Sequence, residues 1–128
     1  MKKWCLVLIF LGAMACSKKE IVIADINLEK WKNDKFGCLG YRNRTLDAFQ
    51  KSKEKLLKMS EVNIMAAFGK PDKAELIEKS QKIYAYYLNG NTNCSNFNDS
   101  DSLIRILHIR FNSTGYSNSL LVFNKIKE

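Results

Sequence analysis

Cysteine and histidine have the most reactive side chains in this chain, and they are few. The sequence has Cys5, Cys16, Cys38, Cys94 and a single histidine, His108. Hydrolysis or acyl transfer needs a nucleophile beside a base and an orienting group, and a zinc site needs several His or Cys ligands at short spacing. The chain also lacks a Gly-x-Ser-x-Gly turn and a glycine-rich phosphate loop. We therefore expect no enzyme activity, no catalytic residues, no metal site and no cofactor.

The beginning of the chain has the pattern of an export signal. Two lysines precede an apolar run over residues 4–15, which is too short for a membrane-spanning helix. The run ends in the letters AMAC at residues 13–16 and resembles the lipobox of bacterial lipoproteins, where cleavage precedes a cysteine that receives the lipid. The resemblance implies that Cys16 is lipidated. The letters AMA also suit ordinary signal peptidase, so cleavage without a lipid is the alternative.

This signal sets the expected organisation of the chain. We expect a signal peptide over residues 1–15, a lipidated N-terminus and tether over residues 16–26, and a single α+β domain over residues 27–128. Ser17, rather than an aspartate, follows the lipobox cysteine. By resemblance to enterobacterial sorting, this implies a location in the outer membrane, with the domain facing the periplasm.

Basic side chains outnumber acidic ones. The chain has 21 Lys and Arg against 13 Asp and Glu, a formal net charge of +8, and removal of Lys2 and Lys3 with the signal leaves +6. A moderate positive charge suits anionic lipid headgroups or an acidic protein partner. Export argues against a nucleic-acid partner. We expect binding to another envelope protein instead.

The two remaining cysteines predict a disulfide. If Cys5 leaves with the signal and Cys16 takes the lipid, Cys38 and Cys94 form an even pair in an oxidising compartment. On the chain-entropy model, a bridge across such a long loop stabilises the domain by about 4 kcal/mol. The alternative is two buried free thiols.

The first half of the domain has helical patterns. Asn27 is a candidate cap for a short helical turn. The aromatic residues that follow it, Trp31, Phe36 and Tyr41, are expected to cover one end of the hydrophobic core. Thr45 is a candidate cap for a helix over residues 45–59. A second helix is expected over residues 60–68, with Ser60 as its cap, Val62, Ile64, Met65 and Phe68 near helical spacing, and Gly69 with Pro71 as its stop.

The second half has strand patterns. We expect strands over residues 74–79, 83–88, 103–111 and 116–125, forming a four-stranded antiparallel meander with a short helix pair packed on it. A turn is expected over residues 80–82, and residues 112–115 form a hairpin turn with Gly115 available for positive φ. The long polar loop over residues 89–102 contains Asp99 and Asp101, but it lacks the spacing of a calcium-binding EF-hand loop.

Several of these motifs together resemble a known family. The segments LLKMSEVNIMAAFGKPDKAE (56–75), YAYYL (84–88), LIRILHIRF (103–111) and NSTGY (112–116) are similar to small outer-membrane lipoproteins of the SmpA/OmlA/BamE type. The resemblance implies a helix pair on an antiparallel sheet and a role beside the machine that inserts β-barrel proteins. WKNDKFGCLGYR (31–42) lies outside that pattern and is similar to a segment of uncharacterised small lipoproteins of the Bacteroidetes.

The expected function follows from the predicted cellular location and from the resemblance to small lipoproteins rather than from a catalytic or binding site. We expect a monomeric, lipid-anchored protein that acts as a protein-interaction or scaffolding module, with a possible link to outer-membrane assembly. The alternative is an inhibitor or immunity-type protein that binds an envelope or secreted enzyme. The exposed sheet face and the loop around Cys94 are the first places to look for a binding surface.

Overall fold

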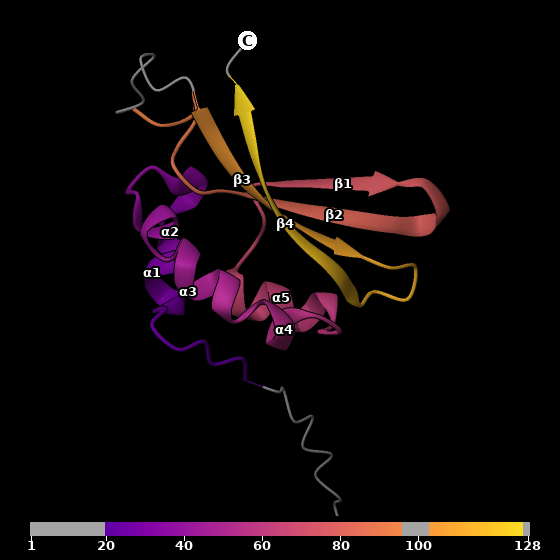
Figure 1. Cartoon of the computed structure of the whole chain (residues 1–128). Helices are drawn as coiled ribbons and strands as arrows, with labels where there is room; N and C mark the ends of the chain where they lie inside the picture. The colour runs from indigo at the N-terminus through magenta and orange to yellow at the C-terminus, as the bar shows by residue number, and fades with distance from the viewer. Residues whose placement is uncertain (1–19, 96–102, 127–128) are drawn as a thin grey trace, which may run out of the picture.

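The computed structural model describes residues 20–95 and 103–126. They form two layers, with short helices packed on one side of an antiparallel sheet (Figure 1). The predicted α+β class is confirmed. The helical segments are α1 (Leu28–Asn33), η1 (Lys35–Gly37), α2 (Tyr41–Arg44), α3 (Leu46–Lys51), α4 (Lys53–Leu56) and α5 (Glu61–Phe68).

The sheet is the antiparallel meander that the sequence predicts, with its four strands in the order β1-β2-β3-β4. The strands are β1 (Lys73–Ile77), β2 (Gln81–Tyr87), β3 (Leu103–Phe111) and β4 (Ser117–Ile126). The turn between the first two strands, η2 (Glu78–Ser80), comes earlier than the expected residues 80–82. Gly115 has a φ of +83°, as expected for the turn between β3 and β4.

The single helix expected over residues 45–59 is wrong, because the chain breaks this region into α3 and α4. Ser52 separates the two helices with φ −95° and ψ 3°. Its N–H donates to the carbonyl oxygens of Ala48 and Phe49 at 3.2 and 3.1 Å. Thr45 does not cap with its side chain; its hydroxyl donates to the carbonyl oxygen of Arg42 at 2.9 Å. Side-chain bonds of this kind bend helices. The predicted helix pair is therefore a series of shorter helices.

The predicted helix caps are confirmed at α1 and α5. The Oγ atom of Ser60 accepts a hydrogen bond from the N–H of Asn63 at 3.2 Å, and α5 ends at Gly69, whose φ is +77°. The Oδ1 atom of Asn27 accepts from the N–H of Lys30 at 3.0 Å. Each cap satisfies an N–H group that the first turn of a helix leaves unbonded.

The hydrophobic core lies between the helices and the sheet. Its largest buried apolar side chains include Trp31, Phe49, Leu56, Ile64, Phe68, Tyr86, Leu107, Ile109 and Phe111. Val62 and Met65 were expected on the apolar side of α5, but both are exposed. Only part of that helix's apolar sequence therefore packs on the core.

The folded part of the chain begins earlier than expected. We expected residues 16–26 to form a tether, but Ile21, Ile23 and Ile26 are buried in the core cluster. This segment runs under the helices on the side away from the sheet (Figure 1). The correction has a simple cause, since burying three isoleucines favours packing over a solvated tether.

Candidate functional site

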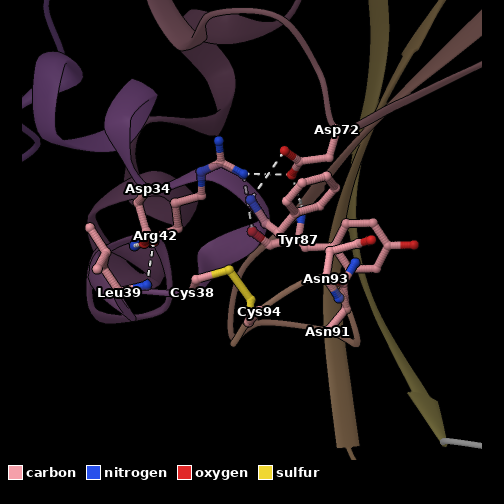
Figure 2. Close-up of a disulfide and its surroundings, with 10 residues drawn as sticks. Asp34, Cys38, Leu39, Arg42, Asp72, Tyr87, Asn91, Asn93 and Cys94 are labelled. Carbon is pink, nitrogen blue, oxygen red and sulfur yellow. Dashed lines mark hydrogen bonds and ion pairs between the residues drawn. A yellow bond between two sulfur atoms is a disulfide. The ribbon is translucent and has the colours of Figure 1, made fainter. Parts of the chain in front are cut away.

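The predicted disulfide joins Cys38, which follows η1, to Cys94 in the loop after β2 (Figure 2). The two Cα atoms are 5.4 Å apart. Gly37 has a φ of +68°, and a Cβ atom at this position would lie 2.4 Å from the carbonyl carbon of Leu88. Glycine is therefore needed where η1 approaches the end of β2. The bridge fastens the loop after β2 to the helical layer.

A buried ion pair lies beside the disulfide (Figure 2). The Nη1 atom of Arg42 is 2.6 Å from Oδ2 of Asp72, and the two side chains are only 1% and 4% exposed. The same Nη1 donates to the carbonyl oxygen of Tyr87, and Nε donates to that of Trp31, each at 3.2 Å. The guanidinium carbon also lies 5.3 Å from the centre of the Trp31 ring. Arg42 is thus held by charge, hydrogen bonds and an aromatic face.

The carboxylates in this region are occupied by backbone donors. Asp72 accepts hydrogen bonds from the N–H groups of Phe36 at 3.2 Å and Tyr87 at 2.8 Å. Asp34 is buried and accepts from the N–H of Leu39 at 2.7 Å and from an N–H of α2 at 2.9 Å. Because these carboxylates are buried and bonded to several donors, they serve to position α1, η1 and α2 against β2. We assign this cluster a structural role.

Sequence reasoning missed this ion pair. The partner of Arg42 lies 30 residues away in the sequence. No rule of local spacing connects positions so far apart. One signal was present: Arg42 ends the segment WKNDKFGCLGYR (31–42) and Asp72 lies within LLKMSEVNIMAAFGKPDKAE (56–75), so the pair joins two segments that carry the family resemblances.

The face of the sheet turned away from the helices carries two cross-strand rows of mainly apolar side chains. The strand register places Ala85, His108 and Leu121 in one row and Tyr87, Ile106 and Phe123 in the next. We call these six residues the outer-face patch. Leu121 and Phe123 are 49% and 45% exposed, although both are large apolar side chains. The ring of Phe36 reaches only the end of this patch, 6.2 Å from that of Tyr87.

Charged residues border the outer-face patch on the same side of the sheet. By register these are Lys73, Glu75, Arg110 and Lys125. The ammonium group of Lys73 lies 2.5 Å from a carboxylate oxygen of Glu75, so these two charges offset each other. Arg110 and Lys125 take part in no ion pair with another described residue. The border of the patch is therefore positively charged.

His108 lies in the middle of the outer-face patch, with its ring 4.8 Å from that of Phe123. Burial holds the pKa of His108 below its usual value of 6.5. The imidazole is consequently neutral at pH 7. It contributes aromatic surface to the patch rather than a charge.

A polar cluster on the helical side of the sheet joins α5 to β2. The ammonium group of Lys82 lies 3.0 Å from both carboxylate oxygens of Glu61, and the hydroxyl of Tyr84 donates to the same carboxylate. The Tyr84 and Lys82 hydrogen bonds hold the pKa of Glu61 below its ordinary value of 4.5, and burial raises the pKa of Tyr84. Neither group is poised to exchange a proton near neutral pH, so the cluster is a structural link.

A pocket of about 580 Å³ lies between residues 20–29 and α5. Its wall is mainly isoleucine, alanine and other apolar side chains, with Lys32 and Glu29 at its edge. These two are already paired at 2.9 Å. No cysteine, histidine or serine is among the described residues that line it. The pocket therefore holds no set of groups suited to catalysis.

Three residues considered in the sequence, Cys16, Asp99 and Asp101, lie outside the described residues. Across residues 20–95 and 103–126, no three His, Cys, Asp or Glu side chains gather closely enough to hold a metal ion. Over those same residues, none of the helices has the length and apolar character needed to span a membrane.

Comparison of the chain with protein-family models, with curated proteins and with solved structures finds no match. The resemblance to small outer-membrane lipoproteins consequently stays a prediction from short motifs.

Proposed function

We propose that this protein is a lipid-anchored protein of the bacterial envelope that binds another protein through the outer-face patch. The observation that carries the proposal is the exposure of Leu121 and Phe123 on the edge strand β4, on the same sheet face as the charged residues that border the patch. An apolar centre within a polar border is the usual composition of a protein interface. Ala85 and Ile106 of the patch are buried, so its exposed surface comes mainly from Leu121 and Phe123, with the half-buried Tyr87 and His108 beside them. Single exposed apolar residues are common on surfaces, but neighbouring ones on one face favour a binding site.

Charge specifies the kind of partner. The two border cations without an ion-pair partner among the described residues, Arg110 and Lys125, favour a partner surface with an apolar centre and acidic side chains around it. The disulfide and the signal pattern support an oxidising location outside the cytoplasm. Attachment through Cys16 would hold the domain near the membrane and near other envelope proteins.

Site-specific crosslinking in living cells tests this proposal. A photoreactive residue at Arg110, on the border of the patch, is expected to capture a second protein. The same residue at Lys55, exposed on α4 in the helical layer, is the matched control and is expected not to capture it. Absence of an adduct at position 110, or the same adducts at both positions, would refute binding through this face.

The captured protein then allows a direct measurement. Phe123→Asp should weaken its binding at least about tenfold, because a carboxylate replaces an exposed aromatic side chain of the outer-face patch. Phe123→Leu keeps an apolar side chain and should bind nearly as the natural protein does. If the captured protein is a secreted hydrolase that loses activity on binding, the inhibitor function is favoured over scaffolding.

The anchor needs a separate test. Cys16→Ser should move the protein from the membrane fraction to the soluble periplasmic fraction, since the lipid attachment atom is removed. Unchanged membrane fractionation of this variant would refute lipidation.

A further inference from the structure

Among residues 20–95 and 103–126, no strand pairs with the outer edge of β4 over most of its length. Ser117, at its start, exchanges backbone hydrogen bonds with Lys58 and Met59 at 2.7 and 2.8 Å. From Asn118 onward, the described part of the chain provides no backbone partner to β4 other than β3. Leu121, Phe123 and Ile126 are exposed along this stretch. Unpaired N–H and C=O groups on an exposed edge strand are a template for another strand.

The backbone groups that face this open edge can be identified. The N–H of Arg105 donates to the Oδ1 atom of Asn89, and its C=O accepts from the N–H of Leu88, so both groups point toward β2. Its register partner across β3 and β4 is Asn124. In an antiparallel ladder such a pair is not hydrogen-bonded, so the N–H and C=O of Asn124 point away from β3. Since this direction alternates along a strand, Val122 and Leu120 also present their groups to the open edge.

The opposite edge of the sheet is protected in a way that this edge is not. β1 is short and carries Lys73 and Glu75, and charged residues on a short edge strand discourage pairing. The stretch from residue 118 to 124 on β4 has the sequence NSLLVFN and contains no charged residue. The contrast singles out β4 as the edge suited to pairing.

We propose that two copies of this protein pair through their β4 strands, antiparallel and centred on Val122. In this register Val122 bonds to Val122 of the second copy, and Leu120 bonds to Asn124, so every open-edge group of these residues finds a partner. Leu121 packs beside Phe123 of the second copy on the outer face, an aliphatic and aromatic pair of the kind that stabilises sheets. Lys125 lies opposite Ser119, so no like charges meet.

The symmetry of this pairing fits the rest of the molecule. A two-fold axis through a hydrogen-bonded antiparallel pair is perpendicular to the sheet, so both helical layers lie on the same side. The described chain begins at residue 20, under the helices and away from the sheet (Figure 1), so this end of both copies lies on the same side of the paired sheet. If the proposed lipid anchor is present, both copies can be attached to one membrane. The two outer-face patches then form one continuous surface.

This inference replaces the monomer that we expected from the sequence, and it does not depend on the proposed partner protein. Its first test uses the unaltered protein, purified from the envelope of an expressing bacterium. Sedimentation equilibrium in density-matched detergent should give twice the chain mass at high concentration and the chain mass on dilution. A single chain mass at every concentration up to the millimolar range would overturn the inference.

Hydrogen exchange of individual amides tests the pairing itself. The N–H groups of Leu120, Val122 and Asn124 should exchange more slowly as the protein concentration rises, because they become bonded only in the dimer. Those of Leu121 and Phe123 point toward β3 and should exchange at rates independent of concentration. If the protein has the mass of a dimer but its amide exchange does not alternate in this way along β4, the two copies meet at another surface, and the proposed β4 register is overturned.

A single position offers a matched pair of variants. Asn124→Pro removes an N–H that faces the open edge and leaves the bonds to β3 intact, and proline is tolerated at such edge positions. It removes one bond from each copy, so dimerisation should weaken about thirtyfold. Asn124→Ala retains the N–H and should dimerise normally. If Asn124→Pro and Asn124→Ala both fold and dimerise equally well, the inference is overturned. If Asn124→Pro does not fold, the hydrogen-exchange measurement on the natural protein decides.

Discussion

Removal of the Asp72 carboxylate should destabilise the domain more than any other loss of an ion pair in the described chain. Asp72→Ala leaves the guanidinium group of Arg42 buried without its 2.6 Å partner, while that side chain is 1% exposed. It also takes an acceptor from the N–H groups of Phe36 and Tyr87. Breaking a buried ion pair from one side costs about 3 to 5 kcal/mol. We expect about 4 kcal/mol, a large share of the stability of a small domain.

Urea unfolding with the disulfide intact measures this loss. With a slope of about 1.5 kcal/mol per molar urea, a loss of about 4 kcal/mol lowers the unfolding midpoint by about 2 to 3 M. Glu29→Ala is the matched control, because Glu29 forms an ion pair with Lys32 at 2.9 Å on the exposed surface. Its removal should cost no more than about 1 kcal/mol.

A double variant separates the buried charge from the lost packing. Asp72→Asn keeps an oxygen for the N–H of Tyr87 but leaves Arg42 charged and unpaired. Adding Arg42→Met removes that charge, so the double variant should be at least about 1 kcal/mol more stable than Asp72→Asn alone. The reasoning is refuted if Asp72→Ala costs less than about 1 kcal/mol, or if the second substitution only adds to the loss.

Three further predictions concern the disulfide, the acid response and the contact at Gly37. Replacing Cys38 and Cys94 together by alanine opens a bridge with a sequence separation of 56 and should cost about 4 kcal/mol in thermal or urea unfolding. Because its hydrogen bonds hold the pKa of Glu61 below 4.5, the ionised carboxylate stabilises the folded state above pH 4.5, and this stability is lost as the pH falls through the lowered pKa. Glu61→Gln should therefore flatten the dependence of unfolding free energy on pH below 4.5. Gly37→Ala places a Cβ atom 2.4 Å from the carbonyl carbon of Leu88 and should cost about 2 to 3 kcal/mol.

Each of these predictions has its own check. Gly115→Ala has the same unfavourable sign of φ but no atom within 4 Å of the added Cβ, so it should cost only about 1 kcal/mol. Equal losses at the two glycines would contradict the clash with Leu88. An unchanged acid response in Glu61→Gln would assign the loss of stability at low pH to other carboxylates. Reduction of the natural protein should destabilise it about as much as the double alanine variant.

Much of the fold was predictable because its signals are local. The strand pattern predicted a strand over residues 103–111, and β3 has these bounds in the structure. Ser60 and Gly69 marked the ends of α5, since caps depend on residues within one turn of each other. Cysteine counting predicted the Cys38–Cys94 disulfide without geometry, because the predicted signal peptide and lipid anchor account for Cys5 and Cys16 and leave two cysteines to pair.

Other features were decided by contacts between distant parts of the chain. The break at Ser52 was hidden because the local sequence suits a continuous helix, and Ser52 is buried only in the assembled domain. Ile21 and Ile23 were assigned to a tether because nothing nearby in the sequence shows what covers them. The outer-face patch is likewise a product of register, since it brings residues from three strands into two rows.

The sequence by itself therefore determined the four strands, the caps at Asn27 and Ser60, the turn at Gly115 and the disulfide, because each depends on neighbouring residues or on the number of cysteines. The tertiary structure alone decided that Arg42 meets Asp72, that Leu121 and Phe123 stay exposed, and that β4 presents an open edge. The physical reason is that burial and pairing belong to positions in space. Residues 30 apart in the chain become partners only after the helices have packed on the sheet.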